Sequence, residues 1–477
     1  MNKKLVLISI ISVLFCVILN EYNLEYLGDR YPAYNKMLTS ADEASYFAPA
    51  RNFIEKGIWK DNSFGFSSFY QRPPIYGALF YVCSILNPTN PYLILKIIQI
   101  ILWGFAVFLM GKILSSFIHS NKIIVIATLC YGIIPSFSGF TYYTLTESLI
   151  PFVILSSVLS LIYVMKYQKY SLVMFSFWGV LLLFRPQLLI IFSGLILSYY
   201  LKVYAVANFK KIIIQGLVFI LPWTMWSVRN YNLNNEIVSV HPIYHYSNNQ
   251  MYRPIHAKMT NLFRVWEVNP TVFHSHMHSL YYDTSLVVRE NVYSQLPIFN
   301  QTDYKIRLLS VFKDYQYVSN ELQTKFIESD YIPENAIRLE KILSQNITFL
   351  IDDLKFNYWD HYYFITPFNS FSKLIISSYL NLQIFQFKHR GSFLMESLRW
   401  FSFLLMFIGF LTLIVNIFNK NVSIWLRLLS VFSLIYIFYL SYIQRLNEDR
   451  YYVLLLPILF ISVVYSIQLI IKKPHSE

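Results

Sequence analysis

The ionisable residues with the clearest chemistry lie just after the first apolar segment. Asp42 and Glu43 are adjacent there, Tyr46 follows one helical turn beyond Asp42, and Arg72 precedes two prolines that open a short apolar run. A carboxylate beside an acceptor hydroxyl or amine can take its proton. The planar guanidinium of arginine matches the oxygens of a phosphate. The pattern therefore indicates proton removal from an acceptor and stabilisation of a departing phosphate.

A second acid and three further arginines extend this candidate set. Glu147 borders an apolar segment, where an acid is favoured by the helix dipole and an ionisable residue is a functional candidate by default. Arg185 interrupts an otherwise continuous apolar stretch, although an arginine that snorkels from a turn is the structural alternative. Arg229 and Arg450 fall near the same predicted boundary. The alternative for each of these arginines is an ordinary role as a membrane anchor, and Glu147 is the exception.

The composition places these residues in a membrane protein. The chain has 477 residues, of which 56% are hydrophobic, 18% aromatic and only 14% charged. Several apolar runs reach the length of about 18–20 residues that a hydrocarbon core requires. The formal net charge of +13 is expected where lysines hold cytoplasmic loops in place, and it does not indicate nucleic-acid binding. The composition excludes a soluble globular protein.

Basic residues and segment lengths predict the topology. Lys3 and Lys4 place the N-terminus in the cytoplasm. Residues 73–86 are short for a crossing and are expected to form a helix at the outer interface; as a full span they would invert everything that follows. The run 171–203 is too long for one crossing, so two spans should meet at an outer turn near Arg185. The ten expected spans are 5–19, 92–118, 123–140, 147–165, two within 171–203, 212–228, 398–418, 422–444 and 451–471.

The same segments divide the chain into three parts. Residues 1–228 are expected to form an N-terminal transmembrane catalytic module that includes the first outer loop, 20–91. Residues 229–396 form a large external insertion, which is either a small folded domain or a cap on the membrane part. Residues 397–477 supply the C-terminal transmembrane helices. The predicted fold is an all-α polytopic membrane protein with about ten transmembrane helices.

Histidines in the insertion raise a metal site as an alternative. His274, His276 and His278 alternate, and alternating histidines in a strand share one face and can bind zinc. No cysteine or carboxylate is spaced to complete such a shell, and the three cysteines of the chain lie in apolar runs. We therefore expect no metal site at these histidines.

In this order, the motifs resemble those of the GT-C superfamily of integral membrane glycosyltransferases, over about residues 1–235 and 395–471. Asp42-Glu43-Ala-Ser-Tyr46 is similar to the family pattern Asp-Glu-x-x-Tyr. A glycine and Arg72-Pro-Pro follow, where the family has Gly and Lys/Arg-Pro-Pro, and Thr-Glu147-Ser-Leu is similar to the second acid that opens a span. The likeness is greatest to the bacterial branch that holds the lipid A aminoarabinose transferases and relatives of the protein O-mannosyltransferases. Further landmarks are Phe184-Arg185-Pro186, Pro222-Trp223 before Arg229-Asn230, and Asp449-Arg450-Tyr451.

The resemblance implies transfer of a sugar, with inversion at the anomeric carbon, from a polyprenyl phosphate to a lipid, glycan or protein acceptor. The expected donor lipid is undecaprenyl phosphate. The protein would lie in the inner (plasma) membrane, with its active site on the periplasmic or extracellular face and no nucleic acid among its partners. Some branches of the family hold a divalent cation beside their acids, so such a cation is an open expectation here and no other cofactor is expected.

The resemblance also implies a role for each candidate residue. Asp42 would be the base or would orient the acceptor, with Glu43 supporting it and Glu147 as the second acid. Arg72 would hold the donor phosphate. The remaining substrate-binding candidates are Tyr46, Arg185, Arg229 and Arg450.

One position departs from the pattern of the aminoarabinose branch. That branch carries arginine immediately before the tyrosine of the first motif, whereas this chain has Ser45. The departure leaves the expected phosphate clamp one charge short unless Arg51 or Arg185 substitutes, and it weakens the case for aminoarabinose as the sugar.

Two other function classes share parts of this sequence pattern. A transporter or flippase for a lipid-linked sugar would also line an outer cavity with arginine, but transporters usually place polar groups at the bilayer midplane and show repeated halves. A lipid-linked glycan ligase or polymerase would place its essential arginine and histidine in the late external loop, whereas the acids here cluster early.

Overall fold

The structure is a computed structural model that describes residues 1–27, 33–34, 37–39, 41–60, 72–203, 209–234, 254–282, 301–329, 334–377 and 393–472. Helices dominate these residues, and the sheet consists of two short antiparallel strands, β1 (Ala33–Tyr34) and β2 (Met37–Leu38). The prediction of an all-α protein is confirmed.

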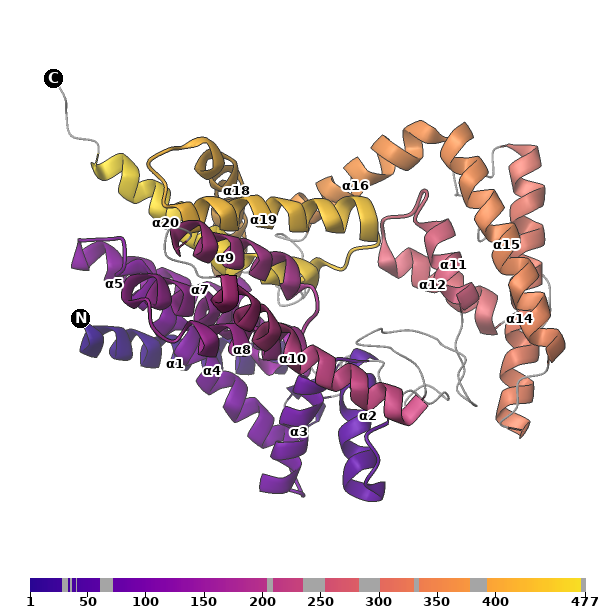
Figure 1. Cartoon of the computed structure of the whole chain (residues 1–477), viewed down its shortest axis with the longest axis horizontal. Helices are drawn as coiled ribbons and strands as arrows, with labels where there is room; N and C mark the ends of the chain where they lie inside the picture. Colours follow the sequence, from indigo (N-terminus) through magenta and orange to yellow (C-terminus); the bar gives the residue numbers. More distant parts are fainter. Residues whose placement is uncertain are drawn as a thin grey trace.

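Five helices of the described chain are long and apolar enough to cross a membrane. They are α1 (Asn2–Leu27), α4 (Pro91–Leu114), α7 (Ile150–Tyr167), α10 (Phe209–Asn234) and α19 (Ile424–Phe438), which continues into the π-helix η9 (Tyr439–Gln444). Shorter apolar helices are α3 (Pro74–Leu86), α5 (Asn121–Ile133), α8 (Ser171–Leu182), α9 (Leu188–Val203), the later part of α18 (Phe393–Phe418), and α20 (Leu456–Lys472). Apart from α3, these helices form one block in which the N-terminus and the end of α20 lie at the same end (Figure 1). Several long apolar helices of this kind fit a multi-pass membrane protein.

Each predicted span overlaps one of these helices, but several bounds differ; span 451–471, for example, begins before α20, because Asp449–Leu454 form the 3-10 helix η10. Five of them coincide with the long helices, and the other five fall on α5, α8, α9, α18 and α20. The predicted turn near Arg185 is confirmed, because α8 ends at Leu182 and α9 begins at Leu188. The predicted extent of the span 123–140 is wrong, because α5 ends at Ile133. Pro135 has no backbone N–H and restricts the residue before it, and the short helices α6 (Pro135–Ser138) and η2 (Gly139–Tyr142) follow.

Two helices of the first loop pack closely and position its motif. Helix α2 (Ala41–Lys56) carries its two acids in the first turn, where the helix dipole favours negative charge. Helix α3 starts with Pro74, whose fixed φ suits the first helical position. Phe47 of α2 stacks on Phe80 of α3 with ring centroids 4.0 Å apart. A Cβ on Gly77 would come within 2.7 Å of the Tyr46 carbonyl oxygen, so glycine is what allows this approach.

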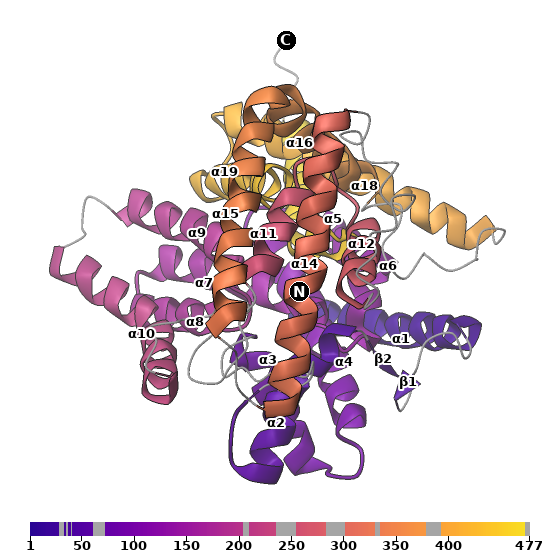
Figure 2. The same cartoon turned by 90° about the vertical axis from the view of Figure 1, so that its right-hand side faces the viewer.

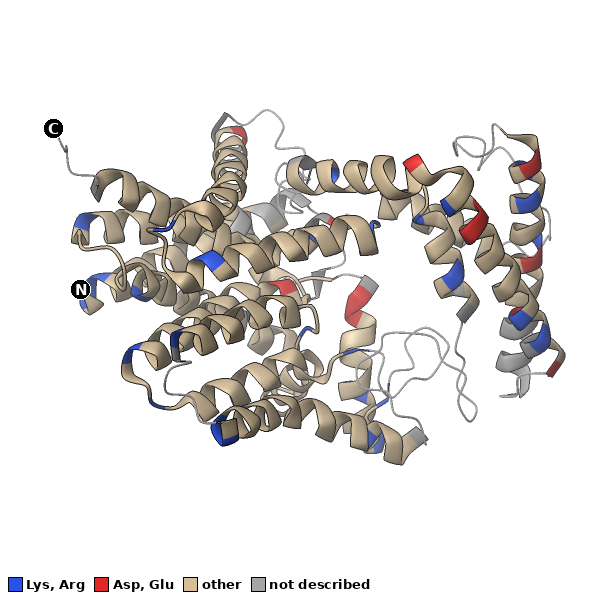
Figure 3. Ribbon diagram, turned by 45° about the horizontal axis from the view of Figure 1, so that its top comes forward, with Lys and Arg blue, Asp and Glu red and all other residues tan. Residues whose placement is uncertain are grey.

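The described part of the insertion has a hydrophobic core of its own. Helices α11 (Pro254–Phe263), α12 (Pro270–Tyr282), α14 (Thr302–Ser329) and α15 (Glu334–Asn357) bury its side chains, among them Met259, Phe312 and Leu350. Helices α14 and α15 run side by side (Figure 2) at the end of the molecule opposite the N-terminus (Figure 1). Charged residues are frequent on these two helices and sparse on the apolar block (Figure 3). The segments η6 (His361–Ile365), α16 (Thr366–Ser372) and η7 (Lys373–Ser377) lead back towards that block.

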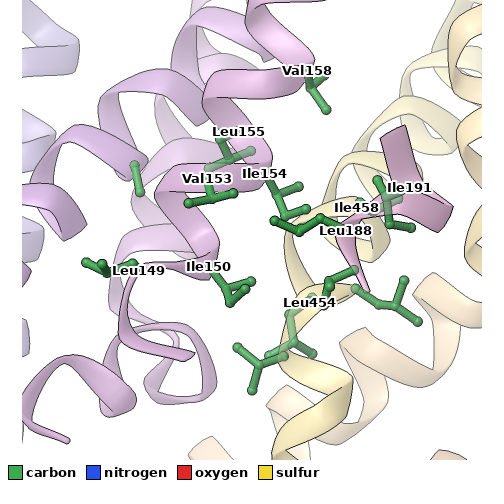
Figure 4. Packing of buried hydrophobic residues seen from close by; sticks show 14 of the residues in the cluster. Leu149, Ile150, Val153, Ile154, Leu155, Val158, Leu188, Ile191, Leu454 and Ile458 are labelled. Atoms are coloured by element: carbon green, nitrogen blue, oxygen red, sulfur yellow. The ribbon is translucent and has the colours of Figure 1, made fainter. Parts of the chain in front are cut away.

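Three segments from distant parts of the chain share one hydrophobic contact. Ile150 and Ile154 of α7 face Leu188 of α9 and Ile458 of α20 (Figure 4). Leu454, from the 3-10 helix η10 (Asp449–Leu454) that precedes α20, joins the same cluster. Close packing of these side chains fixes how the three segments lie relative to one another.

The contact between α8 and α10 gives a stability prediction. A Cβ on Gly179 of α8 would lie 2.2 Å from the backbone oxygen of Phe219 on α10, whereas a Cβ on Gly216 of α10 would meet nothing within 4 Å. We expect Gly179→Ala to lower the free energy of unfolding by about 1–3 kcal/mol through overpacking. Gly216→Ala should be neutral or stabilising by up to about 1 kcal/mol, because alanine favours helix.

Thermal unfolding of the purified protein in detergent would measure both variants. Equal melting temperatures for Gly179→Ala and Gly216→Ala would show that α8 and α10 do not pack this closely.

Candidate active site

One cavity of about 660 Å³ collects most of the candidate residues. Its walls come from the start of α2, the residues before α3, the 3-10 turn η3 (Thr146–Ser148) before α7, the turn between α8 and α9, the residue after α11, and the segments η9 and η10. Its charged lining residues are Asp42, Arg72, Glu147, Arg185, Arg264 and Arg450. Aromatic and apolar side chains, among them Tyr46, Phe184, Leu189, Ile190, Tyr439, Ile443 and Tyr451, complete the lining.

Asp42 is held between two arginines. Arg72 donates from Nη2 to Oδ1 over 2.6 Å, and Arg450 donates from Nη2 to Oδ2 over 2.5 Å. Burial acts to raise the pKa of Asp42, but the charges of Arg72 and Arg450 outweigh it, so this pKa lies below its ordinary value. Asp42 is therefore ionised at neutral pH.

Glu147 forms a buried ion pair with Arg185. The Arg185 Nη1 atom lies 2.9 Å from Glu147 Oε1, and the two side chains are only 9% and 3% exposed. Thr146 Oγ1 donates to Glu147 Oε2 over 3.2 Å. Burial acts to raise the pKa of Glu147, but Arg185 and then Arg450 lower it below its ordinary value. The second acid of the cavity is therefore ionised as well.

Arg450 links these two acids electrostatically. Besides its bond to Asp42, it pairs through Nε with Glu448, and its charge acts on Glu147. Burial acts to lower the pKa of Arg450, but these three carboxylates raise it above its ordinary value. A permanently charged guanidinium thus stands among the carboxylates of three separate segments.

The first motif completes the environment of Arg72. Its guanidinium lies over the ring of Tyr46, with 4.8 Å from Cζ to the ring centroid, and its Nε donates to Ser45 Oγ over 2.8 Å. Ser45 stands at the position where the lipid A aminoarabinose transferases have arginine, and here it is a hydrogen-bond partner of Arg72. Of the two arginines offered as substitutes, Arg185 lines the cavity. Arg51 instead donates to the Tyr92 hydroxyl over 2.6 Å and is not a lining residue.

Two candidates lie outside the cavity lining. Glu43 accepts bonds from Thr144 Oγ1, over 2.9 Å, and from the Tyr92 hydroxyl, so it ties α2 to α4 and to the turn before α7. Arg229 donates from Nη2 to the Trp59 carbonyl oxygen over 2.8 Å and stacks on Trp226. The structure therefore brings together Asp42, Tyr46, Arg72, Glu147, Arg185 and Arg450, but not Glu43 or Arg229.

Sequence reasoning missed one charged residue of the cavity. Arg264 follows α11 in the insertion, a region that resembles no known motif, yet its side chain lines the cavity beside the motif residues. The only signal in the sequence is an arginine directly after an apolar pair, Leu262-Phe263, which is too common a pattern to select it.

The donor set does not fit a bound metal ion. Among the residues that the structure describes, each carboxylate that lines the cavity is bonded to arginine, and four arginines share the lining with two carboxylates. A divalent cation prefers oxygen ligands free of such competition. In the described ranges no three His, Cys, Asp or Glu residues are grouped as metal ligands. His274 and His276 lie in helix α12, where a spacing of two residues puts them on different faces, so they do not share one face as they would in a strand.

The buried ion pair predicts that two arginine variants lose very different amounts of unfolding free energy. Arg185→Gln leaves Glu147 buried without its counter-ion and should cost about 3–5 kcal/mol of unfolding free energy. Arg307→Gln removes an ion pair to Asp353 that is 46% and 34% exposed, and should cost at most about 1 kcal/mol. Chemical unfolding in detergent measures both; an equal loss would mean that the Glu147 pair is not buried.

The depressed pKa of Asp42 predicts a pH-dependent stability. The ionised form is favoured in the folded state, so its contribution is present above the unfolded pKa of about 3.9 and is lost as the pH falls through the lower folded value. We expect wild type to melt above Asp42→Asn at pH 7, with the gap shrinking below about pH 4. Asp352→Asn, on an exposed side chain of α15, is the control and should show no gap. A gap independent of pH would contradict the ionised state of Asp42.

Comparison with known proteins yields no relative from which a role can be transferred. No family model matches the chain, and neither a curated protein nor a solved structure matches it significantly. The role of the cavity is therefore argued from its own residues.

Proposed function

We propose that this protein is a membrane glycosyltransferase of the GT-C type that moves a sugar from a polyprenyl phosphate, such as undecaprenyl phosphate, to an acceptor outside the cytoplasmic membrane. The observation that carries the proposal is the convergence of Asp42 and Glu147 with arginines from four segments around one cavity. The motif resemblance supports the same reaction, and the proposed count of ten spans rests on segment lengths and flanking charges.

The charges of the cavity favour an anionic ligand. In the described part of the chain, four arginines line it against two carboxylates, so cations are in excess there. A guanidinium has five N–H donors, so an arginine that already binds a carboxylate retains donors for phosphate oxygens. Positive groups held in advance around a departing phosphate stabilise the charge that develops on it.

In the proposed reaction, an acceptor hydroxyl or amine attacks the anomeric carbon of the donor sugar. The bond between that carbon and the phosphate oxygen breaks, and its electron pair leaves with the phosphate. The proton of the acceptor passes to a carboxylate, for which Asp42 is the candidate because it is ionised and partly exposed. Glu147 keeps Arg185 oriented towards the cavity through their ion pair. The direct displacement inverts the anomeric carbon.

One wall of the cavity suits the hydrocarbon chain of the donor. Leu189 of α9 and Ile443 of η9 line the cavity and are 48% and 60% exposed. Both belong to helices of the apolar block, so a prenyl chain can approach along them from the bilayer. A lipid phosphate can thus reach the arginines while its tail remains in the hydrocarbon region.

The test combines lipid analysis with two matched variants. Mass spectrometry of membrane lipids from cells that lack the gene should show an accumulated polyprenyl-phosphate sugar and the loss of its surface product. Asp42→Asn should reproduce this effect and lower transfer by at least roughly 100-fold, since a positioned acid–base group contributes about that much. Asp352→Asn, on the exposed face of α15, is the control and should retain transfer.

The same variants separate this proposal from its rival. A flippase for an anionic lipid needs the arginines but no proton acceptor, so Asp42→Asn would then keep the surface product. Full transfer by a stably folded Asp42→Asn protein would contradict the glycosyltransferase proposal.

A further inference from the structure

Arg264 differs from the other arginines of the cavity in having no carboxylate partner in the described chain. Its Nη1 atom donates to Asn261 Oδ1 over 2.9 Å, and its buried Nε atom has no hydrogen-bond partner there. Arg72, Arg185 and Arg450 are each paired with an acid. Arg264 is thus the cavity arginine whose donors are least committed.

The surroundings of Arg264 do not offset its charge. Burial lowers its pKa below the ordinary value, despite the opposing influence of Tyr439 and Tyr451. Arg445 lies close enough for the two positive charges to repel each other. A partly buried cation among cations is costly unless an anion binds beside it.

Side-chain donors from three other segments hydrogen-bond to the backbone around Arg264 and fix its position. Arg445 donates from Nη1 to the Arg264 carbonyl oxygen over 3.0 Å, and Thr366 Oγ1 donates to the Val265 carbonyl oxygen over 2.8 Å. Lys373 Nζ donates to the Val268 carbonyl oxygen over 3.2 Å. These donors satisfy carbonyl groups just beyond the C-terminal end of α11, where negative partial charge is exposed.

Arg445 connects this segment with the cavity wall. It directly follows η9, which contributes Tyr439, Ile443 and Gln444 to the lining, although Arg445 is not a lining residue itself. Its Nε donates to the Tyr442 carbonyl oxygen over 2.9 Å, and its guanidinium stacks on Tyr362 at 4.2 Å. Its backbone adopts a positive φ of 57°, which L-residues rarely do without a reason.

We propose that Arg264 is the group with which the external insertion binds a phosphate in the cavity, and that Arg445 is the positioning residue that aims it. A phosphate bound between Arg264 and the other arginines of the cavity would bridge the two hydrophobic cores of the described chain. Ligand binding would therefore strengthen the attachment of the insertion. The assignment of this phosphate to a polyprenyl lipid rests on the proposed function, whereas phosphate binding by Arg264 does not.

The binding test uses the full-length protein in nanodiscs, with undecaprenyl phosphate and inorganic phosphate as separate probes. Loss of one charge-assisted hydrogen-bond donor should raise the Kd of Arg264→Gln by roughly 10- to 100-fold. Arg338→Gln, an exposed arginine of α15, is the matched control and should keep the wild-type Kd. A rise for both probes supports recognition of phosphate in general, and a rise for the lipid alone supports a lipid-borne phosphate. An unchanged Kd for both probes would overturn the proposal.

A double-mutant cycle tests the positioning role of Arg445. Arg445→Gln should raise the same Kd, while the pair Arg264→Gln with Arg445→Gln should bind no more weakly than Arg264→Gln alone, because Arg445 acts through Arg264. Hydrogen exchange of residues 264–268 in each unliganded variant reports whether the segment remains attached. Fully additive losses of affinity would reject the positioning role.

These results are independent of the test for catalysis. If wild type transfers no sugar but its phosphate affinity depends on Arg264, the glycosyltransferase proposal fails and this inference stands. If Asp42→Asn abolishes transfer while Arg264→Gln binds both probes normally, the inference fails and the proposed function stands.

Discussion

The ion pair between Arg450 and Asp42 is the contact on which the candidate site depends. It joins residues 408 positions apart and so connects the first turn of α2 with the segment that precedes α20. Because Arg450 also acts on Glu147 and pairs with Glu448, its single guanidinium holds three carboxylates near one another. Coulombic attraction outweighs the burial cost of Asp42 and Glu147 only because arginines reach them from other segments. The acids and arginines therefore depend on one another as a network.

Hydrophobic packing supplies the geometry for that network. The contact of α7, α9 and α20 shown in Figure 4 lies just beyond the turns that carry Glu147, Arg185 and Arg450. Apolar helices end where charged residues begin, since charge is costly among hydrocarbon side chains. Packing the ends of three apolar helices together thus gathers the charges at those ends. The insertion adds Arg264, whose neighbours Phe263 and Val265 belong to a separate hydrophobic core, so the cavity combines residues from both parts of the chain.

Much of the helical organisation was predictable, because hydrophobicity and proline act locally. The apolar runs predicted the helical class, the length of the run 171–203 predicted the break between α8 and α9, and the paired prolines predicted the start of α3. The extent of the span 123–140 was wrong because the effect of Pro135 was not weighed against its apolar neighbours. The alternating histidines at 274 and 276 would share one face in a strand, but the surrounding residues form α12 and bury their apolar face in the core of the insertion.

The amino-acid sequence by itself determined the residue types of the site and their order along the chain. Only the tertiary structure decided which of them meet. Asp42 and Glu43 are neighbours, yet a helix turns about 100° per residue, so Asp42 faces the cavity while Glu43 bonds with Thr144 and Tyr92. Arg264 joins the motif arginines through contacts between distant segments that no local pattern encodes. Local periodicity sets where helices run, whereas the meeting of charges depends on how those helices pack.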